Sequence, residues 1–185
     1  MTQLDEPFKT LYLILEEAEP TITGRVEIIL IGGAAMLLAE ARQRVTDDID
    51  ILSSSRGIEQ LKKAIKHPLQ IVPESFLCLH PDYRQACEYV RKLSLPPKIR
   101  VYRLSPLDLA ISKLSRFLEV DIQDIEAILK KEKISRAKLL RRYATARAYY
   151  TNQKDIDFNM KILIKKFYKE NFDPDKDLPR PTGGA

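Results

Sequence analysis

A strand, a pair of glycines, a small-residue helix and a second strand are expected in direct succession near the N-terminus. The continuous apolar run Val26–Ile31 suits a buried strand. Gly32 and Gly33 follow it, and the small apolar residues of Ala34–Ala41 predict a helix that lies close to the sheet. Thr46–Leu52 is expected to form the second strand. A strand that leads through a helix into another strand predicts an α/β fold.

The second strand carries carboxylates on one face. Side chains alternate along a strand, so Asp48 and Asp50 point the same way, about 7 Å apart, while Asp47 points the other way. Carboxylates at this spacing can hold one or two hard cations, and two-metal sites for phosphoryl transfer are built in this way. The alternative is that these aspartates only end a strand at the surface.

Gly32 and Gly33 close the first strand and open the helix. Because glycine has no side chain, backbone N–H groups at this turn can approach a phosphate at the start of the helix. The segment therefore predicts a phosphate-binding turn and, one element later, a pair of metal ligands.

The same segment resembles a known family in several elements that occur in a fixed order. The Gly-Gly pair after a strand is followed by Arg44-x-Thr46-x-Asp48-Ile49-Asp50, and this combination resembles the nucleotidyltransferase fold of the DNA polymerase β superfamily. It resembles more closely the bacterial branch that includes abortive-infection toxin nucleotidyltransferases and related domains of unknown function. The resemblance implies a small mixed sheet flanked by helices with a C-terminal helical region, two Mg²⁺ ions on Asp48 and Asp50, and an NTP as substrate.

Arg44 and Thr46 precede the aspartates at the edge of this site. The resemblance implies that they order the site and contribute to nucleotide binding. The forked donors of Arg44 suit the oxygens of a triphosphate. A salt bridge from Arg44 to Glu40 or Asp47 is the alternative that stays open.

A second block of residues, later in the chain, also resembles the family. Lys113, Arg116, Asp121 and Asp124 match the family's pattern, whereas Val120 stands where a second arginine is usual. The resemblance implies that Lys113 and Arg116 bind the nucleotide's phosphates and that Asp121 orients a catalytic or binding group. Helical spacing alone places Lys113 and Arg116 together on a face away from the apolar stripe. On that basis Lys113 would be solvated, and Asp121 would only cap its helix.

Enzymes of this superfamily commonly add a third carboxylate from a later strand, which deprotonates the attacking hydroxyl. The clearest later strand here, Lys98–Leu104, contains no acid, and Glu74 and Asp82 lie in segments for which the pattern predicts no clear structure. Either the base comes from elsewhere, for example from Asp121, or the protein binds nucleotide without turning it over. The expected function is metal-dependent transfer of NMP from an NTP to a hydroxyl of RNA, such as tRNA, or of a protein. The resemblance also implies a toxin–antitoxin pair, with a cognate antitoxin as partner. The alternative is a catalytically degenerate module that binds nucleotide or RNA.

Most of the remaining chain is expected to be helical. The sequence divides into a nucleotidyltransferase-like core over residues 1–104, a helical region packed on it over 105–172, and a flexible tail over 173–185. Periodicity predicts helices at Pro7–Glu19, Ile58–Lys66, Asp82–Leu93, Asp121–Lys131, Arg136–Tyr150 and Ile156–Glu170, a helix that starts at Ser105-Pro106, and strands at Leu69–Val72 and Lys98–Leu104.

Charge and cysteine content narrow the function only mildly. A net charge of +5 and a pI of about 9.1 permit contact with nucleic acid or nucleotide phosphates. Residues 129–142 hold seven basic residues and one acid, with Tyr143, Tyr149 and Tyr150 close behind. A plain RNA-binding helix is therefore a further alternative to a solvated helical face. The two cysteines match no zinc or disulfide pattern, and the N-terminus lacks a signal peptide, so a cytoplasmic protein is expected.

Overall fold

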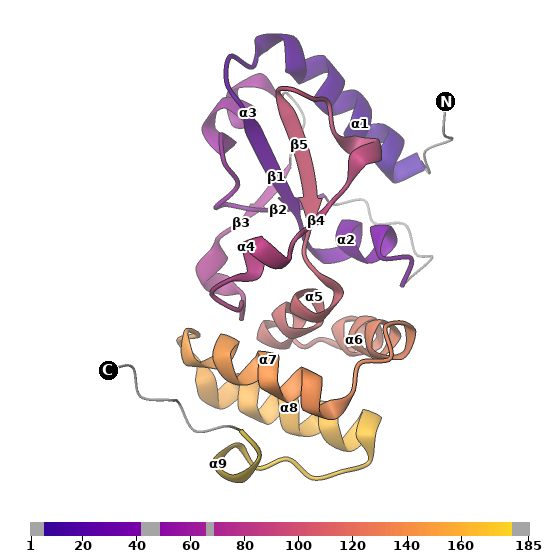
Figure 1. Cartoon of the computed structure of the whole chain (residues 1–185), viewed down its shortest axis with the longest axis vertical. Coiled ribbons are helices and arrows are strands. Elements are labelled where there is room, and N and C mark those ends of the chain that lie inside the picture. The colour runs from indigo at the N-terminus through magenta and orange to yellow at the C-terminus, as the bar shows by residue number, and fades with distance from the viewer. Residues whose placement is uncertain (1–5, 42–48, 66–68, 179–185) are drawn as a thin grey trace. The chain divides into compact units, whose positions relative to one another are not determined.

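The computed structural model describes residues 6–41, 49–65 and 69–178 (Figure 1). The chain divides into two compact units. Met1–Phe76 and Arg84–Ser105 make up the first unit, and Leu77–Tyr83 and Pro106–Ala185 make up the second. The second unit thus takes residues 77–83 from inside the segment that the sequence assigns to the core.

The described residues of the first unit form one mixed sheet. Its strands are β1 (Val26–Leu30), β2 (Asp50–Leu52), β3 (Gln70–Val72), β4 (Glu88–Tyr89) and β5 (Ile99–Arg103). Their order across the sheet is β3-β2-β1-β5-β4. β1 is parallel to β5 and antiparallel to β2, β2 is parallel to β3, and β4 is antiparallel to β5. The expected α/β fold, with a small mixed sheet flanked by helices, is confirmed.

One face of the sheet packs against two helices. α1 (Glu6–Ala18) and α3 (Ile58–Ala64) lie beside β1 and β5 in Figure 1. Apolar residues at helical spacing on α1 face this sheet, because burying each of them is worth about 1.5–3 kcal/mol. The core cluster that they join contains Phe8, Leu11, Leu15, Val26, Ile28, Leu30, Ile51, Leu61, Val90, Leu93, Ile99 and Val101.

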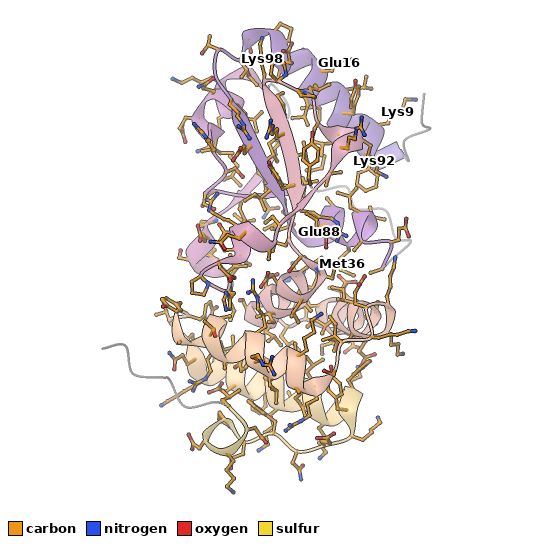
Figure 2. All side chains as sticks on the ribbon, viewed as in Figure 1. Lys9, Glu16, Met36, Glu88, Lys92 and Lys98 are labelled. Atoms are coloured by element: carbon orange, nitrogen blue, oxygen red, sulfur yellow. The ribbon has the colours of Figure 1, made fainter. Side chains whose placement is uncertain are left out.

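α1 ends where proline stops it. Pro20 has no backbone N–H to continue the helix, and a single 3₁₀ turn, Glu19–Thr21, follows α1. Lys98, just before β5, lies beside this end of α1 (Figure 2), and its ammonium group pairs with the carboxylate of Glu19 at 3.2 Å. The ion pair ties the end of α1 to the start of β5.

The second unit is helical. Its main elements are α5 (Pro106–Ser112), α6 (Glu119–Lys131), α7 (Arg136–Ala148), α8 (Gln153–Tyr168) and α9 (Pro174–Asp177). Pro106 occupies the first turn of α5, where its missing N–H costs nothing. Within the described ranges, no helix has both the length and the apolar character that crossing a membrane requires.

Two hydrogen-bonded side chains hold α7 against α8, which lie side by side in Figure 1. Tyr143 donates to the carboxylate of Asp157 at 2.7 Å, and Arg147 donates twice to the same carboxylate, at 2.6 and 2.7 Å. Burial raises the pKa of Tyr143, and the hydrogen bond to Asp157 raises it further. Tyr143 is therefore part of the helical core and not of an RNA-binding surface.

The prediction of one helix over Asp82–Leu93 is wrong. The structure has the short helix α4 (Tyr83–Ala86), then β4, and then a 3₁₀ turn at Arg91–Leu93. The backbone N–H of Val90 donates to the carbonyl of Val101 at 2.8 Å, which joins this segment to β5. Pairing with the sheet, together with burial of Val90, outweighs the helical spacing of the segment.

Candidate functional site

Asp50, the first residue of β2, lies against the turn between β1 and α2 (Gly32–Leu38). The backbone N–H of Ile31 donates to the carbonyl of Asp50 at 3.0 Å and holds the start of β2 beside this turn. Gly32 has a φ of +59°, and a Cβ atom there would overlap the Asp50 carboxylate. Glycine at position 32 is therefore required both by the backbone conformation and by the carboxylate beside it.

The Asp50 side chain points to the face of the sheet opposite the core cluster. Ile51 belongs to that cluster, and side chains alternate along a strand, so Asp50 and Leu52 lie on the other face. The side chain of Asp50 is half-buried. Asp50 is therefore held in a defined position at the turn while it keeps partial access to solvent.

Of the other residues predicted for this site, one lies within the described residues and the rest lie outside them. Gly33 lies in the first turn of α2. Arg44, Thr46 and Asp48 lie outside the described residues. Carboxylate oxygens are the ligands that Mg²⁺ prefers, so the Asp50 side chain could serve as one ligand of such an ion. Across 6–41, 49–65 and 69–178, no three His, Cys, Asp or Glu side chains gather as a metal site.

Replacing Gly32 by alanine is expected to lower the free energy of unfolding by at least about 1–2 kcal/mol, because alanine is strained at positive φ and its Cβ would meet Asp50. Gly24→Ala is the matched control. A Cβ at Gly24 would meet only the flexible side chain of Gln60, at 3.1 Å. Urea unfolding of both variants measures the difference, and equal stabilities would contradict the close approach of Asp50 to Gly32.

Four charged side chains in the second unit form one cluster: Lys113, Arg116, Asp121 and Asp124. The ammonium nitrogen of Lys113 lies 2.8 Å from Asp124 Oδ2 and 3.3 Å from Asp121 Oδ1. Arg116 donates two hydrogen bonds to Asp121, each 2.8 Å long. Both carboxylates are almost fully buried. The second block of the family resemblance is therefore a neutral, hydrogen-bonded cluster of two cations and two anions.

Lys113 is buried, contrary to the expectation of a solvated helical face. α5 ends at Ser112 and a 3₁₀ turn, Lys113–Ser115, follows, so the helical spacing assumed for Lys113 and Arg116 does not continue. The side chain of Lys113 is 7% exposed and that of Arg116 is 64% exposed. Nucleotide binding by both residues stays a prediction, and Arg116 is the member of the cluster that reaches solvent.

Asp121 caps α6 as well as binding the two cations. It stands at the third position of the helix, and its carboxylate accepts the backbone N–H of Leu118 at 3.0 Å. Burial alone would raise the pKa of Asp121. The hydrogen bond from Arg116, the charge of Lys113 and the N–H of Leu118 lower it more, and the net pKa lies below its usual value. The catalytic role of Asp121 stays a prediction.

Acidification should destabilise the second unit through Asp121. A carboxyl group whose pKa is lowered by folding stabilises the folded state above its unfolded pKa, near 3.8, and this stabilisation is lost as the pH falls below that value. We expect the free energy of unfolding to decline from pH 4 downward, and to decline less steeply in Asp121→Asn. Urea titrations between pH 6 and pH 3 measure the slopes, with the exposed residue Glu132→Gln as control. Identical slopes in all three proteins would contradict the pairing.

Asp108 and Arg142 form a second buried ion pair that the sequence did not reveal. Arg142 donates to both carboxylate oxygens of Asp108 at 2.7 Å, and it also lies 2.6 Å from Asp82. Asp108 is 1% exposed. The sequence assigned Asp108 to a helix start and Arg142 to a basic surface, and the residues stand 34 positions apart. The predicted basic helix is in fact the end of α6 and the start of α7, and Arg142 is bound within the unit.

One comparison with known proteins finds a match. A family model described as a nucleotidyltransferase of unknown function (DUF6036) matches residues 9–171. The matched range contains Gly32, Asp50 and the charged cluster around Asp121. No curated protein and no solved structure matches the chain.

Proposed function

The chain belongs to this family of nucleotidyltransferases of unknown function, and from this membership we propose that it transfers NMP from an NTP to a hydroxyl acceptor in a metal-dependent reaction. The observation that carries the proposal is the placement of Asp50 against Gly32. These residues stand at the two ends of the segment that resembles nucleotidyltransferases. A carboxylate beside a glycine turn at the start of a helix suits a bound metal and the phosphates that the metal contacts.

The proposed reaction is an in-line displacement at the α-phosphate. The acceptor oxygen forms a bond to the α-phosphorus, the bond to the β-phosphate oxygen breaks, pyrophosphate leaves, and a base takes the hydroxyl proton. Mg²⁺, when bound by Asp48 and Asp50, would neutralise the negative charge that develops on the phosphate oxygens in the transition state. The residues of the chain position the reactants, which is the main source of catalysis in phosphoryl transfer.

Roles for the remaining predicted residues follow from this reaction. The backbone N–H groups of Gly32 and Gly33 are proposed to face the phosphates, with Arg44 and Thr46 at the edge of the site. Arg116 is the better placed of the two predicted phosphate-binding cations, since its side chain is mostly exposed. Asp121 is the proposed base.

RNA, such as tRNA, or a protein hydroxyl is the proposed acceptor, and a cognate antitoxin the proposed partner, because the segment around Asp50 resembles toxin nucleotidyltransferases. The net charge of +5 favours a polyanionic acceptor. A toxin that modifies RNA would act in the cytoplasm.

A catalytically degenerate binding module is the second candidate, and a specific observation favours it. The carboxylate of Asp121 already accepts hydrogen bonds from Arg116, Lys113 and the Leu118 N–H. A lowered pKa makes a carboxylate a weaker base. In this reading the chain would bind nucleotide or RNA without transferring NMP.

Label transfer distinguishes the two candidates. The full-length protein is incubated with each of the four NTPs carrying an α-³²P label, with total tRNA, and with Mg²⁺ or EDTA. The transferase proposal predicts label on RNA or on protein that depends on Mg²⁺. Binding of labelled NTP without any transfer, across all four nucleotides and with cell extract as the acceptor, would support the degenerate module instead.

A further inference from the structure

Two tyrosine rings lie together at one edge of the sheet in the first unit. Tyr89 of β4 and Tyr102 of β5 are cross-strand partners, with ring centroids 5.5 Å apart and ring planes at 56°. Tyr89 is 47% exposed, and Tyr102 is half-buried. Backbone pairing of β4 with β5 therefore holds an aromatic surface of two rings in a fixed position.

This aromatic pair lies on the same face of the sheet as Asp50. Val90 and Val101 belong to the core cluster on the other face, and alternation along β4 and β5 places Tyr89 and Tyr102 opposite them. β5 is two strands away from β2 in the sheet order. Strand spacing and register put Tyr102 about 12 Å from Asp50. Ile29 and Leu52, which lie on the same face between Asp50 and Tyr102, are buried, so the accessible part of this face is its edge at β4 and β5.

An arginine stands next to the rings on this face. Arg100 is two residues before Tyr102 on β5, and its guanidinium group makes no hydrogen bond or ion pair with the described residues. Glu27 on β1 is the cross-strand neighbour of Arg100, and the carboxylate of Glu27 pairs with Arg25 at 2.8 Å. The charge of Arg100 is therefore available to a ligand, whereas Arg103, on the opposite face, is paired with Glu88.

We propose that Tyr89, Tyr102 and Arg100 form a binding surface for a single-stranded nucleic acid. Unpaired bases stack on the tyrosine rings, and Arg100 contacts the phosphate backbone. Accessible aromatic rings on a sheet beside a cationic side chain are a typical arrangement for this ligand. The surface would hold an RNA acceptor on the sheet that carries Asp50, so its place in catalysis rests on the proposed function, although binding itself does not require catalysis.

The open position of the rings favours a strand of nucleic acid over the base of a mononucleotide. Sites for small molecules are concave and bury most of the ligand. Tyr89 instead stands at an edge of the sheet with nearly half of its surface in solvent. A single strand of nucleic acid can use such a surface, because each stacked base adds to the contacts that neighbouring nucleotides make along the backbone.

Fluorescence anisotropy with labelled oligonucleotides tests the surface. The probes are a 12-nucleotide single-stranded RNA of mixed sequence, the DNA strand of the same sequence, and the RNA duplex. The wild-type protein is expected to bind single strands more tightly than the duplex.

Tyr89→Ala should weaken binding about 5- to 150-fold, which is the range that loss of one stacked base gives. Tyr89→Phe keeps the ring and should bind as the wild type does. Arg100→Ala should lower the slope of log K against log salt by about 0.7, since one phosphate contact is lost.

Matched variants separate this inference from the proposed function. Phe158→Ala removes another exposed aromatic ring, one that is 64% exposed in the second unit, and should leave binding unchanged. Asp50→Asn should keep RNA binding even when it abolishes label transfer. The proposed binding surface would be contradicted by wild-type affinity in Tyr89→Ala, by an equal loss of affinity in Tyr89→Phe, or by tighter binding of the duplex than of the single strands. Failure of RNA binding would still leave transfer to a protein hydroxyl intact.

Discussion

Asp50→Asn is expected to lower the rate of nucleotidyl transfer by about a thousandfold or more, while the protein keeps its stability. The amide has the shape of the carboxylate, so it fits beside Gly32, but it lacks the charge that a divalent cation needs. A thousandfold loss equals about 4 kcal/mol of transition-state stabilisation, which is within the range that a catalytic metal supplies. Steady-state transfer of α-³²P label measures the rate, and thermal unfolding measures the fold.

Glu59→Gln is the matched control for this loss. Glu59 lies on the surface of α3, where it pairs with Lys62 at 2.8 Å, and the variant should transfer label at the wild-type rate. Asp50→Glu keeps the charge but moves the carboxylate by one methylene, so it should retain more activity than Asp50→Asn at high Mg²⁺. Activity of Asp50→Asn within tenfold of the wild type would show that this carboxylate holds no catalytic metal.

Lys113→Met should lower the free energy of unfolding by about 3–5 kcal/mol. The ammonium group lies between the buried carboxylates of Asp121 and Asp124, and its removal leaves them facing each other without the cation. The exposed residue Lys130→Met on the same unit should change stability by less than about 0.5 kcal/mol. Urea unfolding at neutral pH measures both variants.

A second substitution checks that the loss comes from the buried charges. Adding Asp124→Leu to Lys113→Met removes one of the two buried carboxylates that Lys113 pairs with and should restore part of the stability, because residues of one ion-pair network couple by about 0.5–3 kcal/mol. If Lys113 instead served mainly to bind phosphates, Lys113→Met would unfold like the wild type and raise the KM for NTP. That result would contradict the role of Lys113 in stabilising the buried carboxylates of Asp121 and Asp124.

The sequence predicted those elements whose cause is local. Pro20 ends α1, the apolar run from Val26 forms β1, and Pro106 opens α5, each for a reason that the neighbouring residues contain. The importance of Gly32 was also predictable. The structure adds a reason that the pattern did not show, since the missing Cβ makes room for Asp50.

Predictions from the sequence were wrong where residues far apart in the chain determine the structure through their contacts. The segment around Tyr89 has helical spacing, but β5 recruits it as a strand. Helical spacing alone placed Lys113 in solvent, as the alternative to phosphate binding, whereas the structure buries it between Asp121 and Asp124. Asp108 and Arg142 belong to one ion pair across two helices. Such contacts depend on tertiary packing, which periodicity and local propensity do not encode.

A crystal structure of the wild-type protein with a non-hydrolysable NTP analogue and Mn²⁺, whose anomalous signal locates the metal, tests directly whether Asp50 holds a catalytic metal. We expect Mn²⁺ bound to the carboxylate of Asp50 and to phosphate oxygens of the analogue, with the turn at Gly32 beside them. An analogue bound elsewhere on the protein, or bound with no metal at Asp50, would contradict this expectation.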